Sequence, residues 1–155
     1  MQITTPLADE LAHYLDLSAL ELKVTAQNMA NVDTPGYRTV GFNFAAAMQQ
    51  SVESLEERRI DRERTIAATH GLNGDGSQGA FAAMDAASYA EPLPPASDAV
   101  ALHRVGGLLE RPDGNDVSVD REGMNMAKAQ LQFNIGMELL RREYTRVLDA
   151  IHVDK

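Results

Sequence analysis

Apolar residues recur at alternating spacings of three and four near both ends of the chain. On an α-helix this spacing places the side chains along one narrow stripe, as in the seam of a coiled coil. The N-terminal stripe lies within residues 6–31, and the C-terminal stripe lies within residues 121–152. At 1.5 Å per residue, the two helices would be roughly 37 and 45 Å long. The sequence therefore predicts a mainly α fold whose long N- and C-terminal amphipathic helices pack as a coiled-coil-like pair.

The N-terminal helix carries a second apolar face, formed by Leu17, Leu20 and Val24. One partner helix covers one face, so a second face favours burial against adjacent subunits. The alternative is that both faces belong to the core of a helical hairpin. Thr5 is suited to cap this helix, and Pro6 suits its first position. The predicted assembly interface comprises Leu11, Leu15, Leu17, Leu20, Leu22, Val24, Met29, Met126, Phe133, Leu140, Tyr144, Val147 and Ile151.

The chain between the two helices changes character several times. Pro35 and Gly36 suit the centre of a type II turn, with glycine at positive φ, and Tyr37 is expected to anchor this turn by packing. Residues 42–64 predict a second helix that ends in a run of mixed charge. Residues 65–109 are rich in glycine, alanine and proline, which indicates an irregular, flexible middle, with a short helix near residues 80–89 as an option. The predicted divisions are thus 1–64, 65–109 and 110–155, and Glu122 favours the start of the last helix.

The composition excludes several classes of protein. The 155 residues include no cysteine, which excludes disulfides, thiol catalysis and cysteine-ligated zinc. A formal net charge of −9 argues against binding to a nucleic-acid backbone. No stretch reaches the roughly 18 consecutive apolar residues of a membrane span. The first ten residues lack a basic start and an apolar run, so we expect no cleavable signal peptide.

Some motifs of the chain resemble sites of chemistry. Residues 74–79 match G-x-G-x-x-G, but no buried strand precedes them, which favours a flexible glycine loop over a dinucleotide site. Residues 73–77 and 113–116 resemble calcium loops but lack required ligands, so turns are the better interpretation. The four histidines show no metal-binding spacing. We therefore predict no catalytic residue, no cofactor and no metal, and a protein that is not an enzyme.

Residues 27–37 resemble the signature of the bacterial flagellar axial rod proteins, N-x-A-N-x-x-T-P-G-Y. Residues 113–122 are similar to the D-G-N-x-V segment that precedes the last helix in a proximal rod protein of that family. Within the last helix, Ala129 and Phe133 stand where this family member is expected to have asparagine and tyrosine. This difference affects the lateral contacts that the resemblance implies. The fixed positions of the signature are met by Asn28, Ala30, Asn31, Thr34, Pro35, Gly36 and Tyr37.

The resemblance implies a structural subunit of the proximal rod in the flagellar basal body. Such a subunit polymerises through its terminal helices into a torque-transmitting drive shaft in the periplasm, and type III export explains the missing signal peptide. The implied partners are further copies of the chain, the rod subunits FlgC, FlgF and FlgG, the adaptor FliE, and membrane-ring and export-gate proteins, with no nucleic acid and no membrane insertion. A FlgC-type rod protein and a cytosolic helical export adaptor or chaperone are the alternatives.

Overall fold

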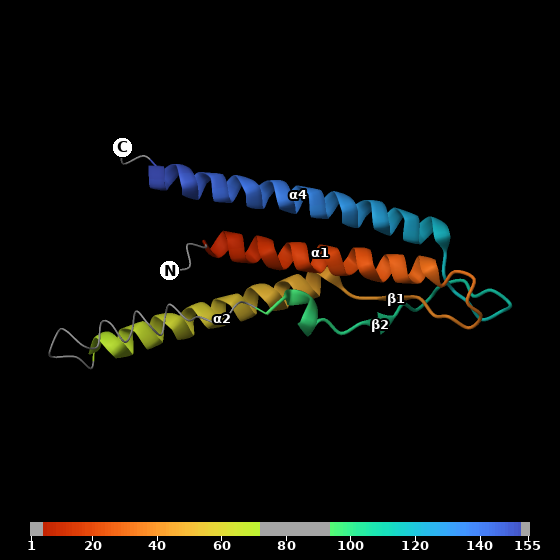
Figure 1. Cartoon of the computed structure of the whole chain (residues 1–155). Coiled ribbons are helices and arrows are strands. Elements are labelled where there is room, and N and C mark those ends of the chain that lie inside the picture. Colours follow the sequence, from red (N-terminus) through yellow and green to blue (C-terminus); the bar gives the residue numbers. More distant parts are fainter. Residues whose placement is uncertain (1–4, 72–93, 153–155) are drawn as a thin grey trace.

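The computed structural model describes residues 5–71 and 94–152, with helices as the main elements (Figure 1). Within these residues the chain forms three α-helices, one short 3-10 helix and a two-stranded sheet. In chain order the elements are α1 (Pro6–Ala30), β1 (Val40–Gly41), α2 (Phe44–Gly71), the 3-10 helix η1 (Ala96–Ala99), β2 (His103–Arg104) and α4 (Val119–His152).

Helix α1 begins and ends close to where its sequence predicts. Thr5 caps the N-terminus, because its Oγ1 accepts a hydrogen bond of 3.2 Å from the Ala8 N–H, and Pro6 opens the first turn. Asn31 is the C-cap, and its N–H donates to the Asn28 carbonyl at 3.1 Å. The predicted cap and first position are confirmed, and the helix ends one residue before the predicted limit.

Helices α1 and α4 lie side by side along the length of α1 and run in opposite directions (Figure 1). Thr5, before the first turn of α1, donates a hydrogen bond of 2.9 Å to Glu143 near the C-terminal end of α4. At the other end of α1, Asn28 donates to Glu122 in the first turns of α4 at 3.1 Å. Polar contacts therefore fix the register at both ends, and the predicted pairing of the terminal helices is confirmed.

Helix α2 packs on the opposite side of α1 and diverges from it along its length (Figure 1). It ends at Gly71, seven residues beyond the predicted limit of residue 64, so residues 65–71 belong to the helix and not to the predicted irregular middle. Residues 94–104 contribute η1, which contacts α1 and α2, and β2, which pairs antiparallel with β1. The short helix considered for residues 80–89 lies outside the described residues.

The apolar core of the described chain is small. The buried apolar residues include three alanines alongside Leu15, Leu17, Val24 and Val117. Fourteen large apolar residues of the described chain are exposed, and nine of these lie on α4. Among the described helices, none combines the length and apolar composition needed to cross a bilayer. A single copy therefore covers only part of the apolar surface that its helices carry.

Candidate functional site

The segment that follows α1 turns back on itself next to the start of α4. The Tyr37 N–H donates to the Thr34 carbonyl at 3.2 Å, which closes a turn over Pro35 and Gly36. Gly36 has a φ of +72°, a value that glycine adopts without a steric penalty. The predicted turn and its positive φ are thus confirmed. The Gly36 N–H also donates to the Asp113 carbonyl at 2.9 Å, which ties the turn to the segment before α4.

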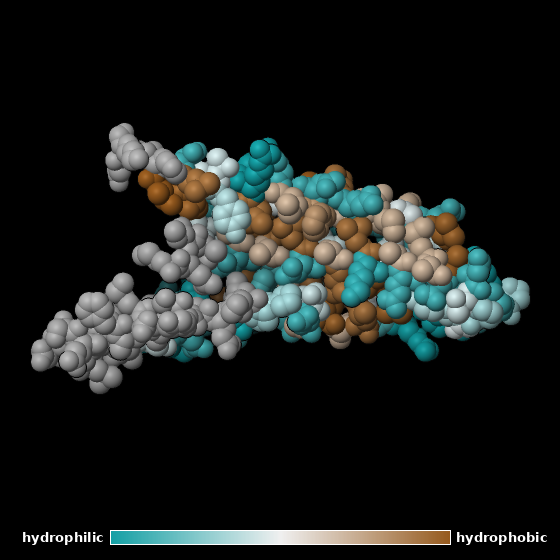
Figure 2. Space-filling view, in the orientation of Figure 1, coloured by the Kyte–Doolittle hydropathy of each residue, from teal (hydrophilic) through white to brown (hydrophobic). Residues whose placement is uncertain are grey.

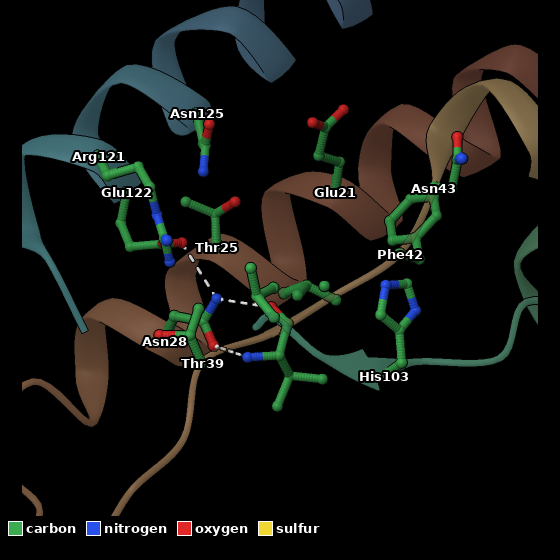
Figure 3. A pocket seen from close by; sticks show the side chains of 14 residues that line it. Glu21, Thr25, Asn28, Thr39, Phe42, Asn43, His103, Arg121, Glu122 and Asn125 are labelled. Atoms are coloured by element: carbon green, nitrogen blue, oxygen red, sulfur yellow. Dashed lines mark hydrogen bonds and ion pairs between the residues drawn. The ribbon is translucent and has the colours of Figure 1, made fainter. Parts of the chain in front are cut away.

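Asn28 joins three parts of the chain through one buried amide (Figure 3). Its Nδ2 donates to the Val40 carbonyl at 2.8 Å and to Glu122 at 3.1 Å. Its Oδ1 accepts from the Val40 N–H and from the Tyr37 hydroxyl, both at 3.1 Å. An amide has two donor hydrogens and two acceptor lone pairs, so Asn28 is fully satisfied. Tyr37 therefore anchors the turn by a hydrogen bond, a contact that the packing prediction did not include.

Asn115 donates hydrogen bonds to the chain at the C-terminus of α1, although more than eighty residues separate the two in sequence. Its Nδ2 lies 2.9 Å from the Asn31 carbonyl, 3.1 Å from that of Val32 and 2.9 Å from that of Thr34. The last carbonyls of a helix lack partners within the helix, and this buried amide supplies donors to the C-cap carbonyl of Asn31 and to the turn that follows it. Its Oδ1 accepts from the Val117 N–H at 2.8 Å. The D-G-N-x-V segment is thus a cap for α1.

Asp116 binds the chain that leaves the turn. Its Oδ1 accepts from the Thr39 N–H at 2.6 Å and from the Thr39 hydroxyl at 2.8 Å. Burial opposes the charged form of Asp116, but the Thr39 hydrogen bonds and the Arg38 guanidinium at 3.6 Å outweigh it and lower the pKa of this carboxyl. Burial, followed by the charges of Glu122 and Asp116, raises the pKa of Tyr37. The ionised carboxylate of Asp116 therefore strengthens the contact between the chain that follows the turn and the segment before α4 near neutral pH.

A cavity of about 380 Å³ opens beside this junction, between α1, the β1 strand and the start of α4 (Figure 3). Asn28, Thr39 and Glu122 on its wall have hydrogen-bond partners within the chain. Glu122 was predicted as a favourable charge in the first turn of the last helix, yet it is buried and accepts from Asn28 and Arg121. The arrangement holds the two helices at a fixed angle to the turn, and these polar groups are engaged in that role.

We call the residues from Asn28 to Val40 and from Asp113 to Glu122 the helix junction. Sequence reasoning identified its signature residues and the turn, but it missed the roles of Thr39, Asn115, Asp116 and Glu122. The signal for them was the polar run Asp113–Asp116 directly before a helix that must pack against α1, since a buried polar run needs partners.

The structure divides the predicted interface residues into three groups. Leu15, Leu17 and Val24 are buried within one copy, where a neighbouring subunit cannot cover them. Burial of Leu17 and Val24 against adjacent subunits is therefore wrong, because the same chain already covers both side chains. Tyr144 and Ile151 are exposed. The remaining residues are half-buried along the helix pair: Leu11, Leu20, Leu22, Met29, Met126, Phe133, Leu140 and Val147.

Helix α4 exposes apolar residues that the sequence analysis did not select. Apolar residues extend over the middle of the molecule and the C-terminal end of α4 in the space-filling view (Figure 2). Met124, Leu131, Ile135 and Leu139 recur at spacings of seven, four and four, which is a helical pattern and the signal that was available. The exposed residues outside the predicted set are Val119, Met124, Leu131, Ile135, Met137, Leu139 and Leu148.

His13 occupies a buried position where α2 and η1 pack on α1. It is 5% exposed, and neither ring nitrogen has a hydrogen-bond partner in the described chain. Burial lowers the pKa of His13, the carboxylates of Asp16 and Asp9 oppose this shift, and Arg58 adds to it. The adjacent cavity of about 100 Å³ is lined by residues of all three elements. A neutral imidazole therefore belongs to the packing of α2 on α1.

The comparisons identify proteins that resemble this chain over most of its length. No protein-family model matches it. The flagellar basal body rod protein FlgB of Borrelia hermsii is 29% identical over 129 residues, which are 81% of this chain and 82% of that protein. FlgB of Salmonella typhimurium is 25% identical over 137 residues, or 88% and 86% of the two chains, and FlgB of Yersinia ruckeri is 28% identical over 126 residues, or 81% and 79%. These similarities support a flagellar basal body rod component, with FlgB as the rod protein that this chain resembles.

Proposed function

We propose that this chain is a structural subunit of the proximal rod of the flagellar basal body. In this function it polymerises through its terminal helices and transmits torque as part of a drive shaft. The similarity to three FlgB proteins over about four fifths of the chain supports the rod. The FlgC-type alternative is less well supported, because these matches carry the FlgB name.

The observation that carries the proposal is the apolar surface of α4. Met124, Leu131, Ile135 and Leu139 are exposed on the side of α4 that α1 does not cover. An apolar side chain that becomes buried contributes about 1.5–3 kcal/mol. Repeated over the subunits of a tube, such contacts stabilise a rigid assembly, whereas one copy leaves these residues in water.

The proposal includes partners and a location. Further copies of the chain, FlgC, FlgF and FlgG would contact it within the rod, and FliE with the membrane-ring and export-gate proteins would contact the rod base. We propose a periplasmic site that is reached by type III export. The function is mechanical and requires no catalytic group.

A substitution on the exposed face of α4 tests this function. Leu131→Asp removes an apolar side chain that is 61% exposed in one copy and would be covered in the rod. We expect loss of swimming and loss of the chain from purified basal bodies, while export continues. Gln130→Asp, at the next exposed position of the same helix, adds the same charge without removing apolar surface and should leave swimming intact.

Fractionation of wild-type cells separates the proposed function from the export-adaptor alternative. A rod subunit is present in purified basal bodies, whereas an adaptor or chaperone stays in the cytosol. Absence of the chain from basal bodies, or normal swimming of the Leu131→Asp strain, would refute the proposal. We also expect the isolated chain to show less helix by circular dichroism than α1, α2 and α4 contain, because its small core only partly offsets the entropy of ordering them.

A further inference from the structure

Two exposed apolar grooves lie on helices that do not contact each other. The α4 groove is lined by Met137, Leu140, Tyr144 and Leu148, with Glu138 and Arg141 among them. Every lining residue of a groove comes from one helix, so each groove is an open and largely apolar helix face. The α2 groove is lined by Met48, Val52, Glu53, Glu57 and Ile60.

Within one copy, the two grooves cannot meet. Helix α1 lies between α2 and α4, and α2 diverges from α1 toward its C-terminal end (Figure 1). The elements that pack on α1 leave α2 and α4 without a direct contact. A contact between the grooves therefore requires two molecules.

The α4 groove carries a positive charge that the chain does not neutralise. Arg142 pairs with Glu138 at 3.0 Å, and Arg146 pairs with Glu143 at 3.1 Å. Arg141, directly before Arg142 in the chain, has no ion pair within the described residues. It is exposed and lines the groove between Met137 and Tyr144.

The α2 groove carries the opposite charge. Glu56 pairs with Arg59 at 2.6 Å, whereas Glu53 and Glu57 have no ion pair in the part of the chain that the structure describes. Both glutamates line the groove, and both lie between Val52 and Ile60 in the sequence. The unpaired acids of α2 thus have the same setting, among apolar residues, as the unpaired base of α4.

The apolar positions of the two grooves extend over similar lengths. Met48 to Ile60 spans twelve residues of α2, which is about 18 Å of helix. Met137 to Leu148 spans eleven residues of α4, which is about 17 Å. When α4 of one copy lies along α2 of another copy, parallel or antiparallel, the apolar residues at the two ends of one groove meet those of the other. In both directions Arg141 then lies close to Glu53 or Glu57.

We infer that the α4 groove of one copy receives the α2 groove of a second copy. This inference rests on the proposed function and names the surfaces through which copies meet. The two surfaces differ, so the contact is heterologous, and a heterologous contact that does not close generates an open-ended array. The charges select this pairing over the contact of two α2 grooves or two α4 grooves, in which like charges would face each other.

Disulfide crosslinking tests the contact directly, because the chain has no native cysteine. Purified Met137→Cys chain is mixed with Met48→Cys chain, which would face it in parallel packing, or with Ile60→Cys chain, which would face it in antiparallel packing, at high concentration and oxidised. We expect a disulfide-linked dimer in at least one mixture and much less in any single variant, and the variant that reacts reports the direction of packing. Asp61→Cys, next to Ile60 on α2 but outside the groove, is the matched control.

A charge exchange then tests the role of Arg141. Arg141→Glu should lower the yield of crosslinked dimer about two- to fivefold, as expected for an exposed ion pair. Adding Glu53→Arg and Glu57→Arg to the partner should restore the yield. Arg104→Glu makes the same change in net charge on β2 and should leave the yield unchanged.

The outcomes separate this inference from the proposed function. Absence of a mixed dimer, or equal yields with Asp61→Cys, overturns the groove contact. If wild-type chain is nevertheless present in basal bodies, the rod function stands and its subunits meet elsewhere. If the mixed dimer forms but the chain is absent from basal bodies, the self-contact stands and the rod function fails.

Discussion

Replacing Asn115 by alanine should destabilise the folded chain through the helix junction. The Val117 N–H would lose its acceptor in a position where Val117 is 3% exposed, and such a loss costs about 1–3 kcal/mol. The amide also provides two donor hydrogens to the carbonyls of the α1 C-cap and of the turn after it, and two hydrogen bonds contribute about 1–3 kcal/mol more. We therefore expect a loss of about 2–6 kcal/mol, against a usual total of 5–15 kcal/mol.

Urea unfolding followed by far-UV circular dichroism measures this loss. An osmolyte such as trimethylamine N-oxide is included so that the comparison starts from a folded chain. With an m-value of about 2 kcal/mol/M, the midpoint should fall by about 1–3 M. Gln130→Ala, an exposed amide on α4, is the control and should change the unfolding free energy by less than about 0.5 kcal/mol.

Asn115→Asp separates hydrogen bonding from packing. Aspartate has the size of asparagine and retains an acceptor for the Val117 N–H, but it places a second oxygen where Nδ2 faces three carbonyls. The variant should be at least as unstable as Asn115→Ala at pH 7. If Asn115→Asp were as stable as the unmodified chain, the capping role of the Asn115 amide would be refuted.

Three further predictions concern the helix pair and its ionisable groups. Gly136→Ala should destabilise the chain, since a Cβ at this position would lie 2.9 Å from Leu15 Cδ2. Gly123→Ala on the same helix meets nothing within 4 Å and should stabilise the chain by up to about 1 kcal/mol. Chemical unfolding compares the two variants, and equal effects would contradict close packing at position 136. The lowered pKa of His13 predicts that stability falls as pH drops below about 6.5, because the unfolded chain then binds a proton that the folded chain does not bind. His13→Leu should flatten this part of the curve of unfolding free energy against pH. An unchanged curve would argue against this role of His13. The lowered pKa of Asp116 predicts a contribution to stability that is present above the ordinary pKa of an aspartate and is lost as pH falls through the folded-state pKa. Asp116→Asn should therefore reduce the loss of stability between neutral and acidic pH in the same measurement. An equally steep loss in this variant would count against the role of the Asp116 carboxylate.

The sequence by itself determined the features that depend on neighbouring residues. The spacing of three and four located α1 and α4, Thr5 and Pro6 marked the start of α1, and the signature turn required glycine at position 36. These features follow from backbone preferences and local hydrogen bonds, which act over a few residues.

Only the tertiary structure decided which apolar face is covered and which polar groups meet. Leu17 and Leu131 are both apolar residues at helical spacing, yet the rotation of the pair buries the first and leaves the second 61% exposed. Asn115 reaches the Asn31 carbonyl from 84 residues away, because the antiparallel pairing of α1 and α4 brings the end of α1 next to the start of α4. Periodicity fixes the existence of a face but not its partner, so the helix junction and the apolar grooves emerge only when both helices are placed.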